Sequence, residues 1–252
     1  MDWLWMKKFI TKTNVWLLSG IVFIFLLWLL TAHIVDNSIV IPKISEVFQA
    51  LGSMLRTKQT YVVIFNTLSR LIITVGISFG IALFLSIVAT SIKVVKEFLK
   101  PIMALMRTIP VAAIIIILLI IFGNTKSPYI ITSLVILPIM YEGILVSFEN
   151  IDQGIIDEVR MLSKLNYKVA KDIYIPIITP QILSTLVATI GLGLKVMVMS
   201  EFIAQPNHTI GYMMLQEKNF LEMDHVFAWT IILIVFVLMV EELLKLIKIK
   251  LK

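Results

Sequence analysis

The chain has 252 residues; 59% of them are hydrophobic, 15% are charged, and the formal net charge is +6. This apolar share is well above that of an ordinary soluble domain and excludes that class. The sequence contains no cysteine, which excludes disulfides and thiolate metal sites. In so apolar a chain, excess positive charge indicates the cytoplasmic loops of a membrane protein, and we do not expect nucleic-acid binding.

The first long apolar run covers residues 15–35 and follows three lysines, Lys7, Lys8 and Lys12. It reaches the ~20 residues that span a bilayer, and no small-residue cleavage site follows it. We therefore expect a retained membrane helix rather than a signal peptide. Beyond it, the spacing of apolar residues before position 60 predicts a short amphipathic helix on the outer surface, capped by Ser45.

Five further apolar runs are long enough to cross a membrane: 61–90, 99–122, 129–148, 181–203 and 226–246. Each run is continuous rather than alternating, which predicts helices. Lipid cannot form hydrogen bonds with backbone N–H and C=O groups, so a single spanning segment must satisfy these groups within itself, as a helix does. The sequence therefore predicts an all-α membrane protein with about six transmembrane helices.

Lysine and arginine predict the orientation of these spans. With the N-terminus inside, the inner segments hold fourteen of these residues and the outer segments five, which favours both ends in the cytoplasm. Residues 204–224 then lie outside, and Pro206 and Gly211 predict a loop with a short helix there. The expected divisions follow in chain order: a cytoplasmic N-terminus (1–14), a first helix with its outer segment (15–60), a core (61–246) and a basic tail (247–252).

One polar segment, residues 149–180, lies on the cytoplasmic side in this orientation. Asn150 or Asp152 can cap a helix there, and Pro176 and Pro180 are expected to stop or kink it before the fifth span. One apolar stripe recurs at helical intervals, at Ile155, Val159, Leu162, Val169 and Ile173. A solvated loop needs no such stripe. Two alternatives remain, a helix on the membrane surface or a helix that docks in a partner's groove.

The same segment resembles the cytoplasmic loop motif of ABC importer permeases. That motif opens with Glu-Ala-Ala, has a Gly six residues after the Glu, and closes with Ile-x-Leu-Pro. Aligned on residues 173–176 (Ile-Tyr-Ile-Pro), the Glu position falls on Asp157 and the Gly position on Ser163. Glu158 and Val159 stand where the two alanines would be. The spacing of the motif is kept while its residues have changed.

Other stretches resemble the nitrate/sulfonate/taurine branch of these permeases. Residues 98–123 (FLKPIMALMRTIPVAAIIIILLIIFG) are similar to its third span, which has an early Pro, an Arg-x-Ile-Pro step and a closing Phe-Gly. Residues 191–204 (GLGLKVMVMSEFIA), with the Gly-Tyr that follows, are similar to its fifth span and outer loop. Residues 219–234 are similar to the start of its last span. The resemblance runs in order over residues 61–244.

This resemblance implies the type I ABC importer permease fold in the bacterial cytoplasmic (inner) membrane, with a coupling helix and no catalysis by this chain. The implied partners are a cytoplasmic ABC ATPase dimer, which would hold ATP and Mg, an extracytoplasmic substrate-binding protein and a second copy of the permease. No cofactor is expected in the chain itself. The implied ATPase-coupling residues are Asp157, Glu158, Leu162, Ser163, Lys164 and Pro176.

The resemblance also implies the class of solute. A small oxyanion of the sulfonate, taurine or nitrate type is expected, and the alternative is a pyrimidine precursor of thiamine or a related heteroaromatic. The rival interpretation from another class is an ATP-independent secondary transporter or channel. That class needs intramembrane carboxylate pairs or repeated halves, whereas Glu142 and Glu201 lie toward the ends of their spans.

Ionisable residues inside spans are costly, and they are therefore functional candidates. Lys195 lies near the middle of the fifth span, where it could attract an anion in the pathway or form a structural pair with Glu201. Arg107 precedes Pro110 at an expected kink, where it could face the pathway, reach the interface or pair with another helix. These four residues form the expected translocation pathway. The three histidines are too scattered to indicate a metal site, and no catalytic motif stands out.

Overall fold

The computed structural model describes residues 12–162 and 167–250, and all the regular structure in these ranges is helical. Five of the helices are long and apolar enough to cross a membrane. The predicted all-α membrane fold is thereby confirmed. The chain forms two compact units: the N-terminal part up to residue 57 with 216–231, and residues 58–215 with 232–252.

The first unit contains α2 (Lys12–Val35), α3 (Ile44–Met54), the end of α10 (Ile210–Asn219) and the start of α11 (Met223–Lys250). Val47, Ala50 and Met54 are buried at helical intervals on α3, as expected for an amphipathic helix. Its N-terminus is capped from Glu46, whose carboxylate accepts a hydrogen bond from the Lys43 amide at 2.8 Å. The expected cap, Ser45, instead lies inside the first turn of the helix.

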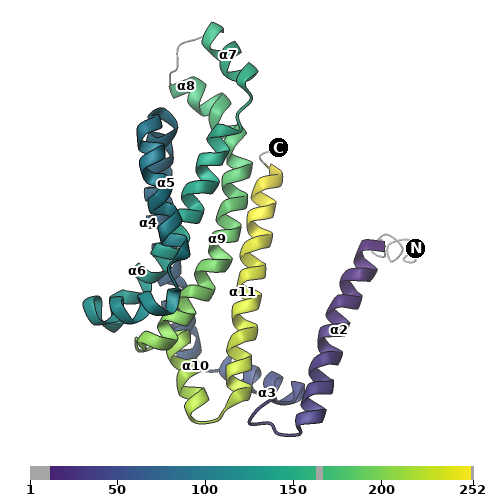
Figure 1. Ribbon diagram of the computed structural model, residues 1–252. Helices are drawn as coiled ribbons and strands as arrows, with labels where there is room; N and C mark the ends of the chain where they lie inside the picture. Colours follow the sequence, from purple (N-terminus) through teal and green to yellow (C-terminus); the bar gives the residue numbers. More distant parts are fainter. Residues whose placement is uncertain (1–11, 163–166, 251–252) are drawn as a thin grey trace. The chain divides into compact units, whose positions relative to one another are not determined.

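The second unit is built on three long helices, α4 (Lys58–Ser91), α6 (Val111–Glu149) and α9 (Ile175–Ala204), which pack together (Figure 1). The buried face of α4 carries mainly small or hydroxyl side chains spaced three or four residues apart. They are Thr60, Val63, Thr67, Leu71, Thr74, Ser78, Ala82, Ser86 and Ala89. Such residues let helix backbones approach closely, which in lipid replaces the hydrophobic effect as the source of helix association.

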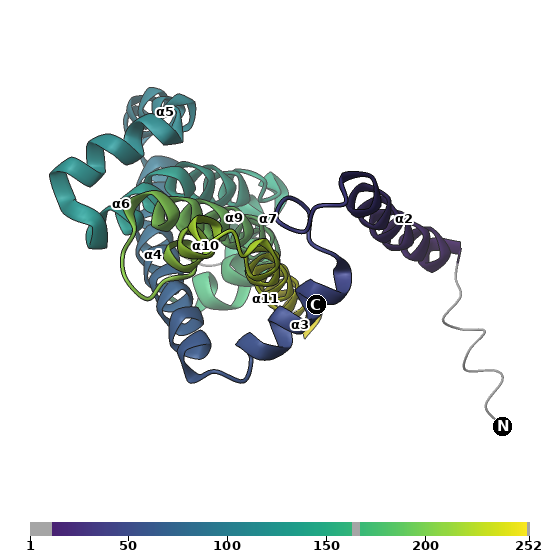
Figure 2. The same ribbon diagram turned by 90° about the horizontal axis from the view of Figure 1, so that it is seen from below.

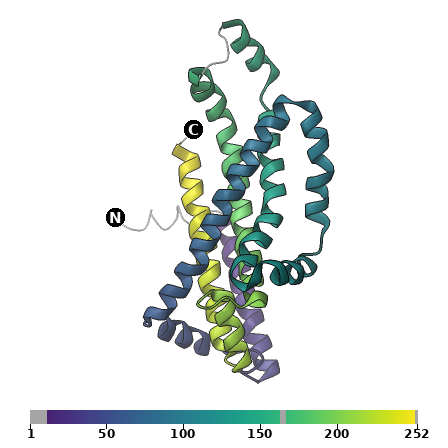
Figure 3. The same cartoon turned by 90° about the vertical axis from the view of Figure 1, so that its left-hand side faces the viewer.

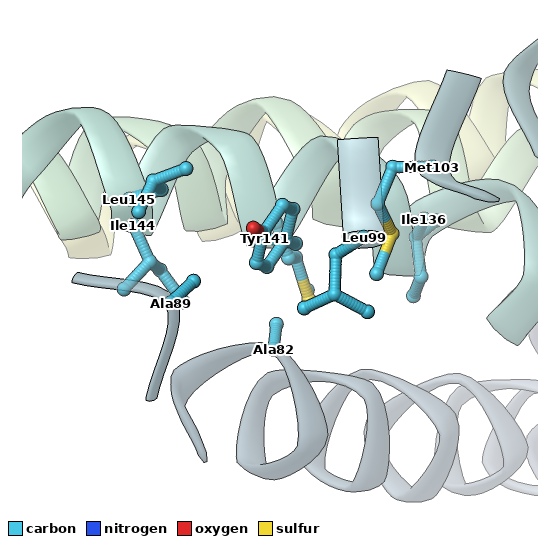
Figure 4. Close-up of a cluster of buried hydrophobic side chains, with 9 residues drawn as sticks. Ala82, Ala89, Leu99, Met103, Ile136, Tyr141, Ile144 and Leu145 are labelled. Atoms are coloured by element: carbon cyan, nitrogen blue, oxygen red, sulfur yellow. The ribbon is translucent and has the colours of Figure 1, made fainter. Parts of the chain in front are cut away.

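A shorter helix, α5 (Lys93–Thr108), returns beside α4 and packs on α6 (Figure 3). The cluster between these helices contains Ala82 of α4, Leu99 and Met103 of α5, and Ile136 and Tyr141 of α6 (Figure 4). All five side chains are at most 8% exposed. This cluster holds α5 against the part of α6 that leads to the polar loop.

The expected span 99–122 is not one helix. Helix α5 ends at Thr108, Ile109 is extended (φ −69°, ψ 127°), and Pro110 is the N-cap of α6. The break follows from Pro110, because proline disfavours the helical conformation in the residue before it. Helix α6 then continues to Glu149 and includes the expected span 129–148. It is kinked at Gly123, whose φ of +73° suits glycine, and Figure 3 shows its first part running across the rest.

From Gln153 on, the described part of the polar loop is helical. Helix α7 (Gln153–Leu162) is followed by α8 (Tyr167–Val169) and by a π-helical turn, η1 (Ala170–Tyr174), which leads directly into α9. Of the two expectations for the prolines, the one that they stop the helix before the fifth span is wrong, whereas a kink there stays a prediction. Pro176 lies in the first turn of α9, where proline is tolerated, and Pro180 lies inside the same helix.

Candidate functional site

Helix α7 projects beyond the neighbouring ends of α6 and α9 (Figure 1). Its N-terminus is capped by Asp152, whose carboxylate accepts a hydrogen bond from the Gly154 amide at 2.7 Å. Ile151 and Val159 are buried, whereas Met161 is 88% exposed. One side of the helix is therefore buried at Val159, and another offers a large apolar side chain at Met161.

The carboxylates of α7 belong to its exposed surface. Asp157 and Glu158 are both exposed, and Asp157 accepts a hydrogen bond from the Gln153 amide group one turn earlier at 3.2 Å. Ser163, Lys164 and the side chain of Leu162 lie outside the described residues. Pro176 is exposed and follows the π-helical turn. A π turn inside a helix commonly marks a functional position, and here it joins the loop to α9.

Arg107 does not stand alone near the break at Pro110. Its guanidinium forms an ion pair with Glu142 of α6, and both side chains are 42% exposed. A second ion pair joins Lys96 of α5 to Glu149 of α6. The two pairs tie α5 to the second part of α6 on either side of the apolar cluster around Tyr141.

Lys195 lies on an exposed stripe of α9. The exposed positions Gln181, Ala188, Lys195 and Met199 recur at intervals of seven and four residues, so they share one face. Lys195 has no ion-pair partner among the described residues, and the structural pair with Glu201 is not formed. The stripe is more polar than the exposed faces of the other spans, such as Ile72, Ile77, Ile81 and Phe84 on α4.

Glu201 lies on a different side of α9 and is fully buried. Its Oε2 accepts hydrogen bonds from the Thr67 hydroxyl of α4 at 2.9 Å and from the Gly211 amide of α10 at 3.4 Å. The Thr67 oxygen also accepts a hydrogen bond from the Ile210 amide at 2.9 Å. We call these four residues the Glu201 cluster. It joins α4, the end of α9 and the first turn of α10, which lies by that end of α9 (Figure 2).

Arg70 is one turn further along α4 from the Glu201 cluster. Its guanidinium donates a hydrogen bond to the carbonyl oxygen of Thr125, just after the kink in α6, at 3.2 Å. It also lies 5.2 Å from the centre of the Tyr129 ring and interacts electrostatically with Glu201. Arg70 therefore fixes the kinked segment of α6 to α4.

Three ionisable groups gather where α10 turns into α11, within the first unit. The side-chain oxygen and nitrogen atoms of Glu217, Glu222 and His225 all lie within 4.8 Å of one another. Burial, and then the hydrogen bond with Glu222, raise the pKa of Glu217 to about 7. This carboxyl group therefore binds a proton near neutral pH.

The residues expected to form a pathway are thus distributed over three places. Arg107 and Pro110 lie at the junction of α5 and α6, Lys195 on the exposed stripe, and Glu201 in a buried cluster. Thr67 was missed by sequence reasoning, although Asn66, Thr67 and Arg70 together interrupt an apolar span. That concentration of polar residues was the available signal.

Comparison with known families identifies one match. Residues 76–251 match the family of binding-protein-dependent transport system inner membrane components. The chain belongs to this family. The protein is therefore an ABC importer permease and a multi-pass protein of the inner membrane, with a role in transport. The break at Pro110 and the kink at Gly123 both lie inside the matched part of the permease.

A solved structure supports the fold of this permease. It is described as the crystal structure of an amino acid ABC transporter with histidines. The match has a TM-score of 0.63 and 19% sequence identity, and it covers 77% of this chain and 95% of the other. At this identity the likeness concerns the fold alone. No match was found among curated proteins.

Proposed function

We propose that this permease imports a small oxyanion of the sulfonate, taurine or nitrate type by alternating access, driven by a separate ATPase dimer. A substrate-binding protein would deliver the solute from outside, and two copies of the permease would enclose the pathway. The observation that carries the proposal is α7, a capped amphipathic helix that projects from the bundle with an exposed apolar side chain.

The docking role rests on what α7 exposes. Met161 is almost fully exposed and lies next to two exposed carboxylates, Asp157 and Glu158. A helix on the membrane surface would present a basic polar face and several apolar side chains. A short helix that exposes Met161 and Ile155 beside two carboxylates instead suits the groove of a soluble partner. The charge count that favours a cytoplasmic loop agrees with a cytoplasmic ATPase.

The elements after α7 suggest how a movement caused by ATP hydrolysis would reach the membrane helices. The π-helical turn η1 leads directly into α9, and Pro176 stands at the start of that helix. Helices commonly bend at a π turn, so bending is easiest there. A movement of the docked loop would therefore reach α9 first.

Co-purification tests the coupling assignment. The tagged permease is extracted from its native membrane in mild detergent, and the preparation is tested for a soluble ATPase and for ATP hydrolysis. We expect both with the wild type, and loss of both in a variant that combines Asp157→Lys with Leu162→Pro. A charge reversal away from the loop, Lys93→Glu, is the control and should keep the ATPase. A permease that purifies alone and transports in liposomes without ATP would instead be a secondary transporter.

The solute class rests on Lys195. An unpaired lysine facing lipid at this depth would be strongly unfavourable. The stripe of Gln181, Ala188, Lys195 and Met199 must therefore face water or protein rather than lipid tails. In a water-filled pathway with low-dielectric walls, a single cation attracts an anion and repels a cation. This favours an oxyanion over a neutral pyrimidine precursor of thiamine.

Uptake measurements test the solute class. Labelled taurine, an alkanesulfonate and nitrate are offered in turn, with a labelled aminopyrimidine as the neutral alternative. For the transported anion, Lys195→Met should lower uptake at least about tenfold, since each 1.4 kcal/mol is a factor of ten. Lys195→Arg, which keeps the charge, should keep a measurable fraction. The matched control on the same stripe is Met199→Leu. Full uptake by Lys195→Met, or a preference for the neutral solute, would refute the oxyanion assignment.

A further inference from the structure

The beginning of helix α10 is part of the second unit. Thr209, Ile210 and Gly211 are buried, whereas the residues after them are only half-buried and the last two are exposed. The approach to α9 is close. A Cβ atom at Gly211 would lie 2.5 Å from the backbone nitrogen of Phe202 and from the carbonyl oxygen of Val198. The first turn of α10 is thus a fixed attachment point for the rest of the helix.

The first turn of α10 is attached by hydrogen bonds, but one oxygen of the Glu201 carboxylate takes part in none of them. The Thr67 hydroxyl donates to Glu201 and accepts from the Ile210 amide, and Asn66 donates to the carbonyl oxygen of His208 at 2.9 Å. Glu201 Oε1, in contrast, is buried without a hydrogen-bond partner among the described residues. The first amides of a helix lack partners within it, and a carboxylate suits them electrostatically.

A purely structural contact would not need this carboxylate. Well-packed apolar side chains usually stabilise a buried contact as well as charged ones do, without the desolvation cost of a carboxylate. What hydrogen bonds add is direction and register. Through them, α10 follows the end of α9 and keeps a defined angle to α4.

We propose that Glu201 is a positioning residue that transmits the movement of α9 to α10 through the hydroxyl of Thr67. The inference rests on the proposed function, because the movement of α9 would begin at the docked loop. The loop and the Glu201 cluster lie at opposite ends of α9 (Figure 1). Glu201 therefore acts where the movement must pass from a spanning helix to the short helix that follows it.

Cysteine labelling tests this inference without knowledge of the solute. The chain has no cysteine, so Met214→Cys in α10 gives one site for an impermeant maleimide. Labelling rates are measured in the complex with its ATPase, without nucleotide and after trapping with ATP and vanadate. We expect the rate to change at least threefold between the two states. ATP hydrolysis is measured in parallel on every preparation.

Four variants in this background separate positioning from packing. Thr67→Val and Glu201→Ala should abolish the change in labelling rate while ATP hydrolysis stays within twofold. Glu201→Gln should keep the change, because the amide oxygen can accept both hydrogen bonds. Thr74→Val is the matched control, since the hydroxyl of Thr74 is also buried on α4 but bonds only to its own helix, at Arg70.

The outcomes separate the two proposals. If Thr67→Val behaves like Thr74→Val, or if Glu201→Gln behaves like Glu201→Ala, the positioning role is refuted. The role is also refuted if Thr67→Val loses ATP hydrolysis together with the change in labelling, because the residue would then be needed for assembly. A wild-type preparation without any ATPase would refute the proposed function itself, and with it the source of the movement.

Discussion

Substituting Gly211 with alanine tests the close contact between α10 and α9. The added Cβ would lie 2.5 Å from two backbone atoms of α9 and 2.6 Å from the Cβ of Glu201, whereas ordinary contacts begin at 3.4 Å. Backbone atoms cannot rotate away. The first turn of α10 must therefore move by about 1 Å, a strain comparable to core overpacking at about 1–3 kcal/mol.

The displacement also affects the hydrogen bonds of the Glu201 cluster. The amide of Ile210 would lose its bond to Thr67, and an unpaired buried donor costs about 1–3 kcal/mol. The total of about 2–6 kcal/mol should lower the thermal midpoint of the purified permease by about 4–24 °C. Gly191→Ala is the control, because its Cβ would meet only Val237 at 3.8 Å. Equal midpoints for the two variants would show that α10 does not lie against α9 as described.

Two further predictions concern ionisable groups. The pKa of Glu217 is raised to about 7 in the folded chain. The stability that comes from the proton shared with Glu222 is therefore fully present below the ordinary value near 4.5, and it is lost as the pH rises through 7. Hydrogen exchange at the Glu222 amide, corrected for intrinsic rates, should accelerate between pH 5 and pH 8 in the wild type. It should not do so in Glu217→Gln, and equal pH dependence in both would contradict the prediction. The half-exposed pair of Arg107 and Glu142 should show a coupling of at most about 1 kcal/mol in a double-mutant cycle of thermal stability. A coupling above about 3 kcal/mol would show that the pair is buried in the assembled permease.

Local pattern was sufficient for most of the fold. Apolar length predicted the long helices α2, α4, α9 and α11, and helical periodicity predicted α3, because these properties depend on residues close in sequence. The failure at 99–122 came from treating apolar length as helix continuity. At Pro110 the local backbone restriction overrides hydrophobicity. At Pro176 a helix end was expected where the helix begins, since proline is tolerated in the first turn of a helix.

The candidate site was less accessible to sequence reasoning. Glu201 was recognised as unusual because a carboxylate in a span is rare, but its partners were not. Thr67 lies 134 positions away from it, and Gly211 reaches it only because the chain turns back after α9. Such contacts are properties of the packed helices. The roles of Lys195 and of the α7 carboxylates stay predictions, since they depend on partners that only the assembled transporter contains.

The geometry of α9 explains why its two charged residues do not neutralise each other. Six residues separate Lys195 from Glu201, which on an α-helix of 3.6 residues per turn puts them about 120° apart. Lys195 consequently belongs to the exposed stripe, while Glu201 faces α4 and the first turn of α10. Moving either charge by one or two positions would bring the two onto one face and allow a pair. Such a pair would remove the cation from the proposed pathway and the carboxylate from α10. In the proposed mechanism, their separation would let one helix present a cation to the solute and a fixed anchor to α10, while its beginning would receive the movement of the loop.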